Sequence, residues 1–339
     1  MSGIGIPRRG ASRDGAGEGH YRRPGSQRVP LTLFPLCGKR EFTAPLGKVM
    51  ASTAASPPVA TVTAYELKLA WPLGAFFLLF FLAPLLLLLF ISFYADTAMT
   101  QFGLTQYAKF LLDPFSLKVL GATLWLGVEV TALCLLLGFP LAYIYCRVPG
   151  WVQGVLILIV LLPLLTSVVV RTFAWIVILG RQGIINTLLL DLGLIDSPLR
   201  LLYTEGGMVV ALAQVQMPLM VLPLITALTR VDPNLADASS ALGAGYWRTF
   251  FKVTLPLTLP GIIAGCLLTY AAALSAFITQ TLVGGGQMLF MSMYLYQQAS
   301  TLNNWPFAAA ISFIFLIAVL AVITIFNMLG KISQGYANA

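Results

Sequence analysis

Two ionisable side chains inside long apolar segments are the first residues of this chain that could do chemistry. Glu129 and Arg171 each lie in a run of mostly apolar residues. A charge at the centre of a membrane helix costs at least about 2.5 kcal/mol, so such residues usually mark a functional site or pair with one another. Glu129 could bind a cation, or it could pair with Arg171 or a neighbouring segment and only hold the helices together. The sequence leaves both interpretations open.

Aromatic residues could complete a cation-binding surface around Glu129. Cations are attracted to carboxylates and to the faces of aromatic rings. We therefore predict a substrate pathway lined by Glu129 with Trp175, Tyr270 and Phe277, and with Arg171 in the same region. The aromatic residues taken alone are more often packing residues.

The sequence contains none of the catalytic motifs that were considered for an intramembrane enzyme or an ATPase. The single histidine, His20, lies in a polar N-terminal stretch, and HExxH and GxSxG do not occur. There is no G-x-x-x-x-G-K-[ST] phosphate-binding loop either. The cysteines are far apart and form no CxxC pair, which makes them small buried thiols rather than zinc ligands or a disulfide framework. They are Cys37, Cys134, Cys146 and Cys266. We expect no catalytic residue, no metal site and no cofactor on this chain.

Composition places most of the chain in a membrane. Of its 339 residues 58% are hydrophobic and 9% charged, with a mean hydropathy of +0.88. Soluble domains carry about 25% charged residues. The net charge of +8 does not indicate a nucleic-acid partner, because ten of the 20 basic residues precede residue 69 and the others are scattered between apolar runs.

Six segments are long and apolar enough to cross a bilayer, which takes about 20 residues per helix. The sequence therefore predicts an all-α integral membrane protein with six transmembrane helices. The expected spans are 71–94, 119–145, 152–178, 207–229, 260–282 and 307–329.

The first 64 residues differ in composition from the rest. They are rich in Gly, Pro, Ser and Arg and lack the apolar core of a secretory signal, so we expect a disordered cytoplasmic tail. Met50, followed by Ala51 and Ser52, offers an alternative start. Residues 65–339 form the six-helix domain, with a cytoplasmic loop over 230–259.

Loop charges predict the orientation. With the tail in the cytoplasm, fifteen basic residues face inward and four face outward, and without the tail the numbers are five and four. The positive-inside bias therefore places both termini in the cytoplasm. The outward segments 95–118 and 179–206 mix short amphipathic pieces with turns. Tryptophans at expected span ends are best explained as interfacial anchors, namely Trp71, Trp151 and Trp305.

The 230–259 loop is more elaborate than a simple connection. Asp232 can cap a helix that begins at Pro233 and runs to Leu242, where Gly243 and Gly245 end it. A second short helix should run over 246–253 and stop before Pro256 and Pro260. Further on, Gly261 and Gly265 form a GxxxG pair that favours close helix packing.

This loop resembles the cytoplasmic signature of permease subunits in binding-protein-dependent ABC importers. That signature reads E-A-A, three residues, G, nine residues, I, one residue, L-P. The matching residues are Asp237, Ala238, Ser239, Gly243, Val253, Leu255 and Pro256. Every spacing matches, while Asp237 replaces Glu and Ser239 replaces the second Ala. Asp237 keeps the carboxylate on a shorter stem.

Other stretches are similar to the spermidine/putrescine permeases of the PotB type. They include PLLTSVVVRTFAWIVILGRQGIINTLL (163–189), LPGIIAGCLL (259–268) and NWPFAAAISF (304–313), and the similarity covers about residue 65 to the end. The resemblance implies a type I ABC importer (MetI-like) permease fold in a bacterial inner membrane. The implied substrate is a polyamine. Ferric iron, an oxyanion and another small organic solute stay open, as does, less favoured, a passive channel or carrier.

The resemblance also implies partners. They are an ABC ATPase pair that holds ATP and magnesium, a second homologous permease subunit and an external solute-binding protein. The signature residues would dock on the ATPase, with Trp247 among the aromatic side chains that fill the joint.

Overall fold

The structure, a computed structural model, describes residues 64–337 of the chain. Apart from one isolated antiparallel bridge between Tyr94 and Phe102, these residues form helices joined by turns and loops. The predicted N-terminal tail, the alternative start at Met50 and Cys37 lie outside the described residues. The three other cysteines are buried as predicted.

The described residues begin with an apolar helical arm. α1 (Ala64–Phe77) continues through a π-helical turn (Leu78–Leu82) into α2 (Ala83–Ser92), which packs against the last helix, α14. The short α3 (Thr105–Leu112) leads into α4 (Pro114–Tyr145).

Asp113 fixes where α4 begins. Its carboxylate accepts hydrogen bonds from Phe115 N at 3.2 Å, Ser116 N at 3.1 Å and Ser116 Oγ at 2.6 Å. The hydrogen bond from the Ser116 hydroxyl, with the two backbone bonds, holds the pKa of Asp113 below its ordinary value. The cap therefore works best when this carboxylate is ionised.

The expected third span, 152–178, is wrong as one continuous helix. It divides into α5 (Gly150–Leu165) and α6 (Val168–Leu179), because Thr166 and Ser167 have extended backbone. α7 (Ile184–Asp191) follows after a turn at Gly180–Gly183. Periodicity could not reveal this break, since both halves are strongly apolar.

The 230–259 region is confirmed as helix, turn, helix, but its end differs from the prediction. α8 (Glu205–Thr229) is followed by α9 (Pro233–Ala241) and α10 (Tyr246–Thr249). α10 then continues through a π-helical turn (Phe250–Thr254) into α11 (Leu255–Leu274). Pro256 and Pro260 therefore do not stop the helix, and the expected boundary before them is wrong.

The expected fifth span, 260–282, is likewise broken. α11 ends at Leu274, and α12 (Phe277–Gly284) begins after a two-residue break. α13 (Met291–Tyr296), a π-helical turn (Gln297–Thr301) and α14 (Trp305–Ala337) complete the described chain.

Six helical segments of the described residues are long and apolar enough to cross a membrane. They are Trp71–Ser92, Pro114–Tyr145, Val168–Asp191, Glu205–Thr229, Tyr246–Leu274 and Trp305–Met328. α5, with 16 residues, is an additional shorter apolar helix. The all-α, six-span prediction is thus confirmed, with different boundaries for the third and fifth spans.

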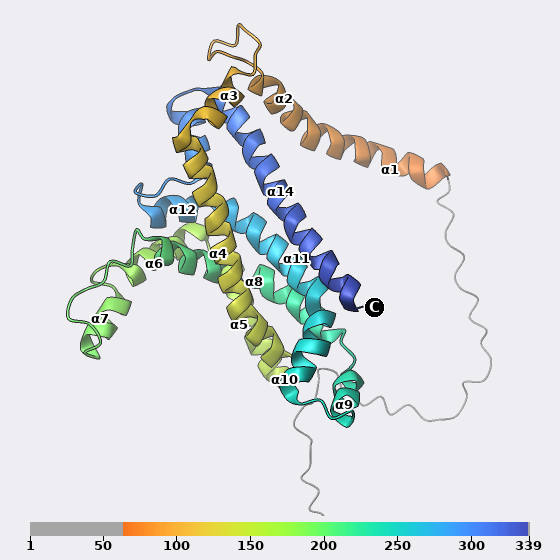
Figure 1. Ribbon diagram of the computed structural model, residues 1–339. Coiled ribbons are helices and arrows are strands. Elements are labelled where there is room, and N and C mark those ends of the chain that lie inside the picture. Colours follow the sequence, from red (N-terminus) through yellow and green to blue (C-terminus); the bar gives the residue numbers. More distant parts are fainter. Residues whose placement is uncertain (1–63, 338–339) are drawn as a thin grey trace, which may run out of the picture. The chain divides into compact units, whose positions relative to one another are not determined.

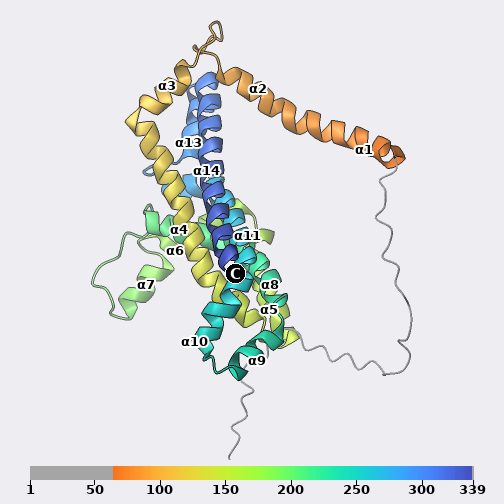
Figure 2. The ribbon, with the colours of Figure 1, turned by 45° about the vertical axis from the view of Figure 1, so that its right-hand side comes forward.

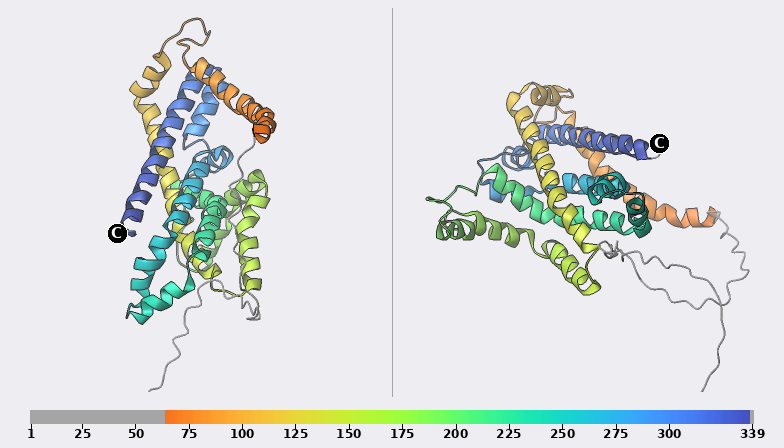
Figure 3. Two further views of the ribbon diagram at one scale, coloured as in Figure 1. Left: turned by 90° about the vertical axis from the view of Figure 1, so that its right-hand side faces the viewer. Right: turned by 60° about the horizontal axis from the view of Figure 1, so that its bottom comes forward.

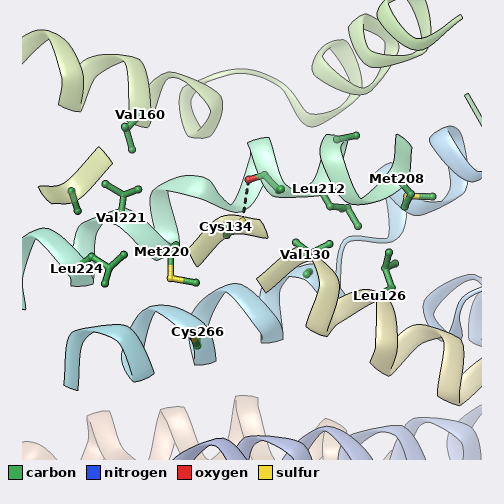
Figure 4. Packing of buried hydrophobic residues seen from close by; sticks show 14 of the residues in the cluster. Leu126, Val130, Cys134, Val160, Met208, Leu212, Met220, Val221, Leu224 and Cys266 are labelled. Carbon is green, nitrogen blue, oxygen red and sulfur yellow. Dashed lines mark hydrogen bonds between the residues drawn. The ribbon is translucent and has the colours of Figure 1, made fainter. Parts of the chain in front are cut away.

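The core lies where α8 packs against both α4 and α11 (Figures 1 and 3). Cys134 of α4 donates to Ala213 O of α8 at 3.3 Å, among apolar side chains from all three helices (Figure 4). A Cβ at Gly261 would lie 2.3 Å from Ala227 Cβ, and one at Gly265 would lie 2.8 Å from Met220 Sδ. The GxxxG pair therefore allows α11 to approach α8 closely, as predicted.

Candidate functional site

The elbow, defined as residues 232–254, joins α8 to α11 and lies at one end of these helices (Figures 1 and 2). Asp232 starts it by accepting a hydrogen bond from Asn234 N at 2.9 Å. With Pro233 in the first turn, α9 begins where the sequence predicted.

Gly243 ends α9 in a Schellman motif. Gly243 N donates to Ser240 O at 3.0 Å, and Ala244 N donates to Ser239 O at 3.1 Å. This geometry requires the left-handed backbone of Gly243, whose φ is +82°. Glycine adopts it without the steric penalty of a Cβ atom. The turn that separates the two helices of the elbow therefore depends on this residue.

A side-chain hydrogen bond holds the two helices of the elbow together. Ser239 Oγ of α9 lies 2.9 Å from Thr249 Oγ1 of α10. Ser239 is half-buried, so the hydroxyl that replaces the family alanine is used inside the elbow and not on its surface. The sequence could not show this pairing.

Aromatic side chains fasten the elbow to the end of α4. Phe250 packs edge-to-face on Phe139 and Tyr143, with ring centroids 5.7 and 5.9 Å apart. Tyr246 Oη donates to Tyr143 Oη at 3.1 Å. Arg147 lies over the Tyr143 ring, 3.3 Å from guanidinium carbon to centroid. The elbow is thereby in direct contact with α4 as well as being continuous with α8 and α11.

The rest of the elbow presents apolar, acidic and basic side chains at its surface, the basic ones being Arg248 and Lys252. Leu242 is 90% exposed and Trp247 68% exposed, and Trp247 stacks on the exposed Phe251. Asp237 and Ala238 of the signature are also exposed. An exposed apolar patch on a fixed backbone is typical of a protein interaction surface.

The last three signature residues serve the joint between the elbow and α11. Val253, Leu255 and Pro256 are half-buried. Leu255 N donates to Phe250 O, five residues back, in the π-helical turn. Proline has no N–H and its ring clashes with the carbonyl four residues earlier in a regular α-helix, so the wider turn directly before Pro256 accommodates it.

The five predicted pathway residues make contacts with separate partners. Glu129 is half-buried and accepts a hydrogen bond from Trp125 Nε1 at 2.7 Å. Arg171 is also half-buried, and its Nη1 donates to Pro163 O at the end of α5. Glu129 and Arg171 therefore do not pair with each other in this structure.

The three aromatic candidates also differ in their surroundings. Trp175 Nε1 donates to Gln214 Oε1 of α8 at 3.3 Å, while Phe277 packs on Tyr296 with ring centroids 5.2 Å apart. Tyr270 is 0% exposed. Its ring occupies the space that a side chain at Gly127 would need.

Two amides in this region were not predicted from the sequence. Gln214 accepts from Trp175, and Gln280, only 1% exposed, donates to Ala273 O at 2.9 Å. A neutral polar residue inside an apolar run could have indicated them. An amide in a membrane needs hydrogen-bond partners, just as a charged group does. The prediction considered charged and aromatic residues alone.

A groove of about 530 Å³ lies along α8 and α11 next to the elbow. Its lining is apolar except for Thr226 and Arg230. Among the described residues, no cluster of three or more His, Cys, Asp or Glu side chains could hold a metal ion.

Solved structures place this fold in a known class. A bacterial ABC transporter involved in import of the acidic polysaccharide alginate contains a chain that matches with a TM-score of 0.62 at 18% identity, over 79% of this chain and 97% of that one. The match extends to a bacterial alginate ABC transporter in complex with a periplasmic protein bound to an alginate pentasaccharide, at a TM-score of 0.62. The fold is that of an ABC importer permease.

Curated relatives then give the family. The spermidine/putrescine transport system permease protein PotB of Haemophilus influenzae is 35% identical over 241 residues, which cover 69% of this chain and 82% of the relative. The molybdenum transport system permease protein ModB of Escherichia coli is 33% identical over 219 residues, covering 62% and 93%. No protein-family model matches the chain. The chain belongs to the permease subunits of binding-protein-dependent ABC importers, a multi-pass membrane family, and resembles the PotB permeases within it.

Proposed function

We propose that this chain is the permease subunit of an ATP-driven importer for polyamines, and that it receives its motion from a separate ATPase through the elbow. The observation that carries the proposal is the elbow itself. Its backbone is fixed by the Asp232 cap and the Schellman turn, while Leu242 and Trp247 remain exposed. A rigid surface with exposed apolar side chains suits docking better than it suits a simple connection.

The elbow is built to transmit force. α9 is bonded to α10 through Ser239 and Thr249, and α10 continues without interruption into α11. Phe250 connects the same unit to α4. A push on α9 by a closing ATPase would therefore move α4, α8 and α11 together, which supports alternating access by rocking of packed helices.

The proposed complex has further members. We infer an ATPase pair that binds ATP and magnesium, a second homologous permease and an external solute-binding protein, with this chain in the inner membrane and both termini in the cytoplasm. The solved complex of the alginate transporter with a periplasmic protein supports the external partner. The charge bias of the loops supports the orientation.

The polyamine assignment rests on the PotB relatives and on Glu129. A half-buried carboxylate beside an indole ring suits an organic ammonium group. The relative named for molybdenum transport makes an oxyanion the second candidate. Arg171, a half-buried cation whose hydrogen bond goes to a carbonyl, is the observation in this chain that favours an anion.

The docking role is tested by co-purification of the ATPase with this chain. Leu242→Glu places a charge on the exposed apolar surface of the elbow without removing a packed side chain. We expect it to lose most of the bound ATPase. Leu194→Glu, at a side chain 67% exposed in the loop after α7, is the matched control and should retain it. Equal retention by both variants would contradict the docking role.

The substrate is tested with the assembled importer in proteoliposomes. ATP-driven uptake of radiolabelled putrescine and spermidine is expected, with competition by unlabelled polyamines and none by molybdate. Uptake of molybdate in place of polyamines would favour the second candidate while keeping the permease role.

A further inference from the structure

Two of the spans expected from the sequence are each interrupted by a two-residue break. The first break, Thr166–Ser167, separates α5 from α6, and the second, Ser275–Ala276, separates α11 from α12. Thr166 and Ser167 are extended, with ψ of 147° and 132°. At the second break Phe277 N donates to Ser275 O at 2.8 Å across Ala276, whose φ of −78° and ψ of 57° form an inverse γ-turn. Neither pair of helices is connected by a continuous ladder of helical hydrogen bonds.

Each break is spanned by one polar side chain from the helix that follows. Arg171, four residues after Ser167, donates to Pro163 O in the last turn of α5. Gln280, four residues after Ala276, donates to Ala273 O at 2.9 Å and to Leu274 O at 3.4 Å in the last turn of α11. These side chains add hydrogen bonds to carbonyls at the helix ends, where the regular helical partners are missing. Pro163 O also accepts from Thr166 Oγ1 at 3.1 Å, and Ala273 O from Ala276 N at 3.4 Å.

The two helices beyond the breaks are joined to each other. α6 and α12 pack side by side (Figure 1). Thr172 Oγ1 lies 3.3 Å from Thr279 Oγ1, and both residues are buried. Because the Thr172 hydroxyl already donates to Val168 O at 2.7 Å, Thr279 is the donor in this pair. The contact sits directly next to the two side chains that span the breaks.

We propose that α6 and α12 form one unit that shifts relative to α5 and α11 during transport, with Arg171 and Gln280 as the positioning residues that hold it in the present arrangement. The proposal rests on the proposed ATP-driven function. Two joints that lack helical hydrogen bonds, with a buried contact beyond them, define a body that can move as a whole. If each pair formed one continuous α-helix, α6 could move only together with α5, and α12 only together with α11.

The motion is tested with the complete importer in nanodiscs, using a chain whose native cysteines are replaced by alanine. Spin labels at Ile159→Cys on α5 and Val177→Cys on α6 lie on exposed side chains and report the distance across the first break. ATP with vanadate should shift this distance. An unchanged distance, in a complex whose ATPase is trapped by vanadate, would overturn the proposal.

The prediction that α6 and α12 move together is tested by joining them with a disulfide. Thr172→Cys with Thr279→Cys places two thiols where the hydroxyls are now in contact. Oxidation to the disulfide should leave the ATPase activity of the complex and ATP-driven uptake at the level of the reduced protein, because the two helices move together. Loss of both on oxidation, restored by reduction, would show that they must separate.

The positioning role is tested with Gln280→Leu, which keeps the size of the side chain and removes its hydrogen bonds. Although Gln280 lies at the second break, the variant should broaden the spin-label distances across the first. Thr281→Val is the matched control, since the Thr281 hydroxyl donates to Phe277 O within α12 and contacts Met293 Sδ of α13 at 3.6 Å, and neither contact spans the break. Arg171→Met should broaden the same distances, which provides a second variant if Gln280→Leu does not assemble. Broadening by neither variant would refute the role.

Failure of this inference differs from failure of the proposed function. If the chain is not coupled to an ATPase, no ATPase co-purifies and uptake needs no ATP. If only the inference is wrong, ATP-driven uptake persists while the distance across the first break stays fixed.

Discussion

Substitution of Gly243 should weaken the coupling of ATP hydrolysis to uptake, in proportion to the strain that each side chain adds to a left-handed backbone. The φ of Gly243 is +82°, and a Cβ built there meets no atom within 4 Å, so the cost comes from the backbone alone. A Cβ in the left-handed region costs about 1–2 kcal/mol, more for a β-branched residue and less for Asn. Because 1.4 kcal/mol is about a factor of ten in population, Gly243→Val should reduce the fraction of correctly formed elbow by about tenfold or more.

The prediction is tested with the series Gly243→Asn, Gly243→Ala and Gly243→Val. ATP-driven uptake and ATPase co-purification should fall in that order, with Asn near the parent. Gly245→Ala is the control, because Gly245 has an ordinary φ of −69° and equally open surroundings. Full ATP-coupled uptake by Gly243→Val, or equal losses for Gly243→Val and Gly245→Ala, would refute the reasoning.

Three further predictions concern the membrane helices. Gly261→Ala should destabilise the protein in detergent by about 1–3 kcal/mol, since the new Cβ would overlap Ala227, whereas Gly121→Ala, with no atom within 4 Å, should be neutral or stabilising in the same thermal unfolding assay. Glu129→Gln should lower polyamine uptake about tenfold or more with normal assembly, because a charge-assisted contact is lost; unchanged uptake would remove Glu129 from the pathway. Asp113→Asn should be less stable than the parent at neutral pH, and the difference should shrink as pH falls below about 4. The pKa of Asp113 is lowered in the folded state, so its contribution is present above the ordinary Asp pKa and is lost as pH falls through the folded value.

The elbow could be predicted well from the sequence because its signals are local. Asp232 and Pro233 mark a helix start and Gly243 marks a helix end by backbone chemistry alone, and the structure has both. The close approach at Gly261 and Gly265 was also readable, since small residues at that spacing favour one kind of packing.

The breaks in the third and fifth spans could not be predicted, because they depend on contacts between distant residues. Thr166–Ser167 and Ser275–Ala276 lie in apolar stretches with no glycine or proline at the break itself. What supports them is Arg171 and Gln280 reaching back to carbonyls, together with the packing of α6 on α12. Pro256 caused the opposite error, because the sequence predicted a helix end before it and the helix continues. The π-helical turn before Pro256 accommodates a proline that a regular α-helix would exclude.

The π-helical turn at Phe250–Thr254 also sets the direction in which the elbow faces. A single surplus residue in a helix offsets everything before it by about 100° around the axis, since an α-helix has 3.6 residues per turn. Removal of one residue from this turn would therefore rotate Trp247 about a quarter of a revolution around α11 and break the contacts of Tyr246 and Phe250 with α4. The direction of the proposed docking surface thus depends on the number of residues in this turn, and a one-residue deletion should reduce ATPase co-purification although Leu242 and Trp247 are still present.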